Sequence, residues 1–230
     1  MEAEFDLSTP FHVRLLCALT LVLPFITFPL FAKNMKKVSD RYRLWVTPPP
    51  VFFSIWAVII SCYDLIAIYS LYPNSWSTTA WICFAVSNFC ISGWVVVFSQ
   101  GTKTAVNLGG LITVVLVFSN QTQWVELCSN KQQTMIDVIT RNIFAFGQGW
   151  FIAAASLSLG IYMVYTVGLN LQLHRTFFWI TTPVFFGMFL LANETRFPPF
   201  TNTLALLFSM VWALVGAGTT SVQPLNEVTP

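Results

Sequence analysis

Charged side chains are scarce in this sequence: Asp, Glu, Lys and Arg make up 9% of its 230 residues, whereas 56% are hydrophobic. Soluble domains carry about 25% charged residues, so this composition excludes an ordinary soluble domain and predicts a polytopic membrane protein. The net charge is only +2, and no basic run with interleaved aromatic residues is present. We therefore expect an integral membrane protein with no nucleic-acid partner.

Motifs of known catalytic and metal sites are also missing. The chain has two histidines, His12 and His174, and no HExxH, GxSxG or phosphate-loop pattern. Four of its five cysteines fall in apolar segments, while Cys128 is expected in a loop, so no disulfide framework is visible. We expect no enzyme, no catalytic residues and no metal site.

The sequence does contain seven apolar runs of helical length, and no alternation typical of strands. The runs cover residues 11–32, 51–72, 79–99, 104–119, 142–168, 175–192 and 200–218. They predict an all-α fold, a polytopic transmembrane helical bundle of about seven helices, organised as a single integral membrane domain over residues 1–230. Residues 219–230 are expected to form an extended tail. Pro24 and Pro29 should kink or end the first helix.

The distribution of basic residues predicts the orientation. Seven of the eleven lie on one predicted side, five of them in a segment 33–43 that we expect to be a loop. By the positive-inside rule this side faces the cytoplasm or the matrix. On the opposite side we expect a polar surface loop from Asn120 to Arg141, with sequons at Asn120 and Asn193.

The segment 46–72 combines three prolines (48–50), an apolar stretch and one acid, Asp64. About 22 helical residues span roughly 33 Å, enough to cross a hydrocarbon core of about 30 Å. Asp64 is therefore expected inside the membrane, protonated, paired or next to water. Two interpretations stay open: it lines a ligand pocket or proton path, or it is a neutral acid that clamps two helices. Candidate partners are Asn88, Gln148, Ser156 and Tyr165.

Nine tryptophans divide into two predicted groups. Those near the ends of the runs suggest an interfacial belt: Trp45, Trp76, Trp81, Trp124 and Trp179. Those placed deeper are candidates for the wall of a pocket for a flat apolar ligand: Trp56, Trp94, Trp150 and Trp212. A stripe of small residues at Gly149, Ala153, Ser156 and Gly160 should let another helix approach closely.

The segment from Pro48 through Phe53-Ser54-Ile55-Trp56 resembles the longer tryptophan-rich sensory proteins of the TspO/MBR (translocator protein) family. Trp81 to Trp94, with Asn88 between, and Gly149-Trp150 follow in the same order. The resemblance implies a five-helix core over 45–170 and two additional transmembrane helices within 171–218. It also implies a pocket for porphyrins or sterol-like lipids near Pro49, Trp56, Asn88, Trp94 and Trp150, and an intracellular organelle, foremost the mitochondrial inner membrane.

Two positions differ from that family pattern: Ile60 stands where a tyrosine is expected, with Tyr63 nearby, and Ser158 replaces an asparagine. The leading hypothesis is a protein that binds or carries an apolar ligand (a tetrapyrrole, sterol or lipid), with Asp64 added to the five pocket residues. The alternative is a non-catalytic accessory subunit of a larger membrane complex, for example a mitochondrial respiratory assembly. A third hypothesis, a proton-coupled transporter using Asp64, lacks the internal repeat of such proteins. Expected partners are membrane lipids, an apolar small molecule, and complex subunits or a second copy.

Overall fold

The computed structural model describes residues 9–44, 46–47, 51, 54–72, 76–129, 134–194 and 201–218. In these ranges every long regular element is a helix. The elements are α1 (Phe11–Leu19), α2 (Val22–Arg41), α3 (Ile55–Ser70), α4 (Thr78–Phe98), α5 (Lys103–Ser129), α6 (Met135–Tyr162), the π-helical η2 (Met163–Val167), α7 (Leu171–Glu194) and α8 (Thr201–Gly218). With α1 and α2 counted as one span, these match the seven predicted runs and confirm the all-α bundle.

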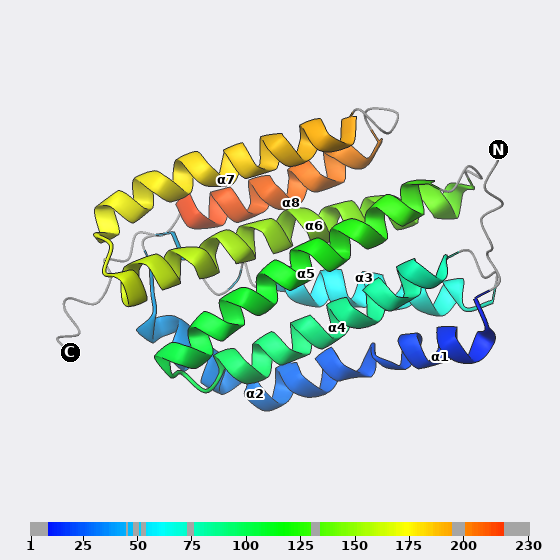
Figure 1. Ribbon diagram of the computed structural model, residues 1–230, viewed down its shortest axis with the longest axis horizontal. Helices are drawn as coiled ribbons and strands as arrows, with labels where there is room; N and C mark the ends of the chain where they lie inside the picture. Colours follow the sequence, from blue (N-terminus) through cyan, green and yellow to red (C-terminus); the bar gives the residue numbers. More distant parts are fainter. Residues whose placement is uncertain are drawn as a thin grey trace.

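The helices run roughly along the long axis of the molecule, with α1 and α2 at one edge and α7 and α8 at the other (Figure 1). Among the described residues, four stretches are long and apolar enough to cross a membrane: Phe11–Arg41, Thr78–Phe98, Lys103–Cys128 and Met135–Val167. Helix α3 is a shorter apolar helix. These lengths and compositions confirm an integral membrane protein.

The first span is interrupted, as its prolines predict. Residues Thr20 and Leu21 separate α1 from α2, and the interruption begins four residues before Pro24. Proline has no N–H to donate to the carbonyl four residues earlier, so the Thr20 carbonyl accepts instead from Leu23, at 3.1 Å. Pro29 lies inside α2. A prediction based on proline thus located the break.

Helix α2 continues well beyond the predicted end of the first run, to Arg41. The expectation of a loop over 33–43 was therefore wrong for most of that segment. Its basic residues occupy the last turns of a helix, where positive charge is favourable because the helix dipole is negative at that end. A prediction from hydropathy ends the helix at its last apolar residues, whereas the helix itself continues through the charged residues that follow.

The expected polar loop from Asn120 to Arg141 was also wrong. Helix α5 extends to Ser129, and α6 begins at Met135 behind a capping box formed by Thr134 and Asp137. Cys128 consequently lies in a helix and is buried. Asn120 and Gln123 in this polar stretch are fully buried, so their side chains face the bundle rather than water.

A buried hydrogen-bonded network joins α3, α5 and α6. The Tyr63 hydroxyl donates to Asn120 Oδ1 at 2.6 Å, and Asn120 Nδ2 donates to Gln148 Oε1 at 2.6 Å and to the Phe144 carbonyl at 3.2 Å. Gln148 Nε2 donates to the Val117 carbonyl at 3.2 Å. Asn120 is 0% exposed, so this sequon cannot carry a glycan in the folded chain.

Two glycines of α6 allow neighbouring side chains to approach its backbone. A Cβ added at Gly147 would overlap the Tyr63 hydroxyl, and one at Gly160 would overlap the imidazole of His174. Of the predicted small-residue stripe, Gly160 therefore has the expected close contact, whereas Ala153 borders a cavity described below. A close approach at Gly147 was not predicted.

The Tyr63→Phe variant should lower the free energy of unfolding by about 1 kcal/mol, because it leaves Asn120 Oδ1 without its hydroxyl donor in the bundle. Tyr69→Phe is the matched control, since Tyr69 lies on the same helix and is 49% exposed. Denaturant unfolding in mild detergent measures both. Equal stability of the two variants would contradict the importance of the network.

The Gly147→Ala variant should destabilise the fold by about 1–3 kcal/mol, because the added methyl group displaces Tyr63 from its partners. Gly187→Ala serves as the control, because a Cβ at Gly187 meets nothing within 4 Å. The measurement is the shift in melting temperature of each purified variant. A loss of the same size in both would show that helix packing at Gly147 is not special.

Candidate functional site

A cavity of about 320 Å³ lies between α2, α3, α4 and α6. Its wall on the α2 side comes from Phe28, Ala32, Met35, Lys36, Ser39 and Asp40. The α6 side contributes Trp150, Ala153, Ala154, Leu157, Ser158 and Ile161. Phe178 of α7 and Ala213 of α8 close it at the back. The two C-terminal helices, α7 and α8, therefore contribute to the cavity together with α2, α3, α4 and α6.

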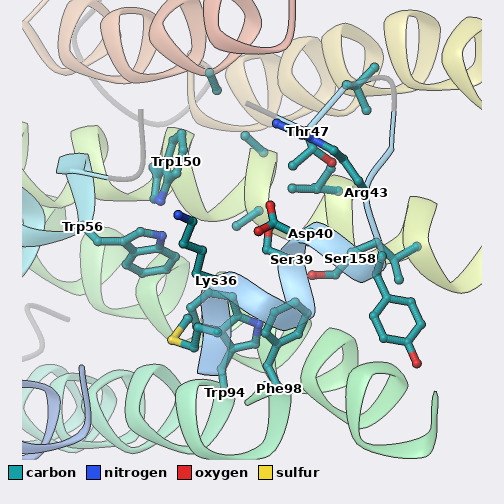
Figure 2. Close-up of a pocket in the computed structure, with 18 of the residues that line it drawn as sticks. Lys36, Ser39, Asp40, Arg43, Thr47, Trp56, Trp94, Phe98, Trp150 and Ser158 are labelled. Carbon is teal, nitrogen blue, oxygen red and sulfur yellow. The ribbon is translucent and has the colours of Figure 1, made fainter. Parts of the chain in front are cut away.

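Three tryptophans from three helices form the aromatic part of the wall (Figure 2). Trp56 of α3 stacks on Trp94 of α4, with ring centroids 5.5 Å apart and planes at 22°. Trp150 of α6 meets Trp56 edge-on, at 6.1 Å and 83°. Phe28 and Phe98 extend the group, at 6.2 Å from Trp56 and 5.5 Å from Trp94. The rings fix one another, so this wall is preformed.

The other end of the cavity is polar. Figure 2 shows Ser39, Asp40, Arg43, Thr47 and Ser158 around it, while the Lys36 side chain reaches toward the tryptophans. The segment after α2 is fixed there by hydrogen bonds from two tyrosines: Tyr165 donates to the Arg43 carbonyl at 2.7 Å, and Tyr42 donates to the Gly101 carbonyl at 3.2 Å. Tyr165 belongs to η2, and π-helical turns are frequent at functional sites.

The structure brings three of the six predicted site residues together: Trp56, Trp94 and Trp150 all line the cavity. Asn88 lies elsewhere, and its Nδ2 donates to Thr20 Oγ1 at 3.1 Å, joining α4 to the break between α1 and α2. Pro49 falls outside the described residues. Ligand binding by these residues remains a prediction.

Asp64 is buried, at 5% exposure, as the sequence predicted. It does not line the cavity, and neither carboxyl oxygen has a hydrogen-bond partner among the residues described. The partner expected for it was therefore wrong: Gln148 and Tyr165 bond elsewhere, as does Ser156, whose hydroxyl donates to the Ile152 carbonyl. The structure supports neither a clamp between helices nor a pocket position for this acid.

The division of the tryptophans into an interfacial belt and a pocket group was only partly correct. Trp76, Trp81 and Trp124 are buried in the bundle, and the rings of Trp76 and Trp81 lie 4.6 Å apart. Trp179 is half-exposed, as a belt residue should be. Trp212 stacks on Phe208 and does not line the cavity. Trp45 falls outside the described residues.

The sequence did not indicate the charged residues of the cavity, because their segment was interpreted as a loop. Phe28, Ala32, Lys36 and Asp40 follow one another at intervals of four, the spacing of one helix face. This signal becomes readable once α2 is extended past residue 32. It would have placed Lys36 and Asp40 on the same side as Phe28.

Comparison with known proteins gives one match. A model of the TSPO-like protein family matches residues 11–227, nearly the whole chain. No curated protein and no solved structure matches it. The family match spans all the helices that build the cavity.

The Asp64→Leu variant should be at least as stable as the parent, because an apolar side chain of similar size replaces a buried acid without hydrogen-bond partners. A gain of about 1 kcal/mol corresponds to about 2–4 °C in melting temperature for a chain of this size. Gln148→Leu is the contrasting variant. The Gln148 side chain is also buried but is hydrogen-bonded at both ends of its amide, so replacing it should lower the melting temperature. A clear loss of stability in Asp64→Leu would show that the acid has a partner.

Proposed function

Because this chain belongs to the TSPO-like protein family, we propose that it binds or carries an apolar ligand (a tetrapyrrole, sterol or lipid) in the cavity bounded by Trp56, Trp94 and Trp150. The observation that carries the proposal is the convergence of three indoles from three helices on one cavity. The proposed role is non-catalytic: the chain holds a ligand within the bundle and releases it unchanged.

The chemistry of the wall supports this role. Ligand sites are concave, mostly apolar, and span about 300–1,000 Å³, a range whose lower end includes this cavity of about 320 Å³. Indole faces offer a large area to a flat apolar body. Because the rings already contact one another, binding requires little side-chain ordering, which is one of the main costs of association.

The arrangement also suggests how a ligand would lie. The tryptophans are at one end of the cavity, Asp40 and Arg43 lie toward the other, and Lys36 reaches between Trp56 and Trp150 (Figure 2). A ligand with an apolar body and a polar end fits this polarity. Its body would contact the indoles, and its polar end would face the surface layer of the membrane.

A cavity-filling variant tests the proposal. Ala154 lines the cavity, so Ala154→Phe should occupy the space a ligand needs. With the full chain in phosphatidylcholine nanodiscs, protoporphyrin IX should quench tryptophan emission saturably. We expect Ala154→Phe to weaken this binding at least about tenfold, a difference of about 1.4 kcal/mol.

Ala57→Phe is the matched control, because Ala57 lies on the exposed face of α3 and adds the same ring outside the cavity. It should bind protoporphyrin IX as the parent does. Quenching that never saturates, or equal affinity in Ala154→Phe and the parent, would overturn the cavity as the ligand site.

A second candidate function, an accessory subunit of a larger membrane complex, is favoured by the exposure of the first span. Within its most apolar stretch 17% of the residues are buried, against 50% for α4. Leu16 and Leu30 are among its exposed residues. Lipid or a partner helix would cover this face, so the mass of the native particle in mild detergent separates the two functions. A particle much larger than the 25.9 kDa chain would favour the subunit.

The proposed location is an intracellular organelle, foremost the mitochondrial inner membrane, on the basis of the family resemblance. Co-migration of the tagged full chain with inner-membrane markers on a density gradient supports it. Enrichment with another organelle would contradict it.

A further inference from the structure

Three charged residues line the cavity, and their charges do not cancel. Lys36 and Arg43 are cationic, and Asp40 is the single acid in the lining. Within the described part of the chain, the side chains of these three residues form no ion pair. The lining of the cavity thus has a net positive charge.

The two cations border the cavity on different sides. In Figure 2 the side chain of Lys36 reaches toward the space between Trp56 and Trp150, whereas Arg43 lies farther from the tryptophans, beside Thr47. The backbone of Arg43 is fixed by the hydrogen bond from Tyr165. One ammonium group and one guanidinium group therefore border the same cavity as the three tryptophans.

Membrane orientation alone does not account for this placement. Lys33, Lys36 and Lys37 of α2 are all exposed and all satisfy the positive-inside rule, but of these three lysines only Lys36 also lines the cavity. This difference between neighbouring lysines provides matched controls.

We propose that the ligand is an anionic amphiphile, with its apolar body against Trp56, Trp94 and Trp150 and its carboxylate or phosphate bound by Lys36 or Arg43, the two cations that border the cavity on different sides. This inference rests on the proposed function and names the ligand class for the same cavity. Hydrogen bonds from ammonium or guanidinium groups to an anion are about twice as strong as hydrogen bonds between neutral groups. A guanidinium can also donate to both oxygens of a carboxylate. A neutral sterol would leave both cations without this interaction.

The test compares an acid with its neutral ester. We use 9,10-dibromostearate and its methyl ester, whose bromines quench tryptophan on contact, with the full chain in phosphatidylcholine nanodiscs at alkaline pH. The acid should bind the parent about tenfold more tightly than the ester. In the K36M/R43Q variant the affinity for the acid should fall to that for the ester, and a melting temperature equal to that of the parent shows that the variant is folded.

The control variant, K33M/K37M, removes the same number of charges from the same end of the bundle and should retain the preference for the acid. A third probe, dibromostearoyl lysophosphatidic acid, distinguishes a phosphate site from a carboxylate site by its affinity relative to the acid. Addition of inorganic phosphate alone should not displace either probe, because it lacks the apolar body.

The possible failures are distinguishable. Equal affinity for acid and ester in the parent, or an unchanged preference in K36M/R43Q, overturns the anionic ligand while leaving the cavity as a binding site. A preference lost equally in K33M/K37M also overturns it, since it would then reflect the overall charge of the surface. Failure of both probes to quench saturably, in the parent as in Ala154→Phe, would overturn the proposed function itself.

Discussion

The hydrogen bond from Tyr63 to Asn120 is the contact on which the arrangement of α3, α5 and α6 depends. Within a membrane, helices gain little from burying apolar side chains against one another, so close packing and polar contacts between them determine which helices associate. The ring of Tyr63 also packs edge-on against Phe151, with centroids 6.2 Å apart, and Phe151 stacks on Trp56 with centroids 5.5 Å apart. The polar network therefore continues into the aromatic wall and fixes the position of the cavity.

The sequence predicted the helices well where one physical signal dominated. The apolar runs located the seven helical segments of the described chain, and Pro24 located the break in the first one. The prediction of helices from the sequence was wrong where polar residues are helical. Asn120 and Gln123 read as loop residues because hydropathy registers their polarity but not the inward orientation that buries both completely. The end of α2 failed for a related reason, because its charged turns lie beyond the apolar core of the span.

The candidate site shows the same division. Trp56, Trp94 and Trp150 were identified by their depth in the runs and by the family resemblance, and they line one cavity. Asp64 was correctly expected to be buried, but spacing along one helix cannot say which neighbour it faces. Asn88 was placed in the pocket by resemblance alone, yet it bonds to Thr20 instead. Contacts between helices far apart in sequence are the information that a single sequence lacks.

The break at Thr20 and Leu21 has a mechanical consequence for the cavity. Helix α2 supplies one side of the cavity wall, and it meets α1 at a turn where the main-chain hydrogen bond from residue 24 to residue 20 is missing because Pro24 has no N–H. Asn88 of α4 donates to Thr20 Oγ1 at this same turn. The position of that side of the wall relative to α1 therefore depends on a side-chain contact with α4 as well as on the main chain.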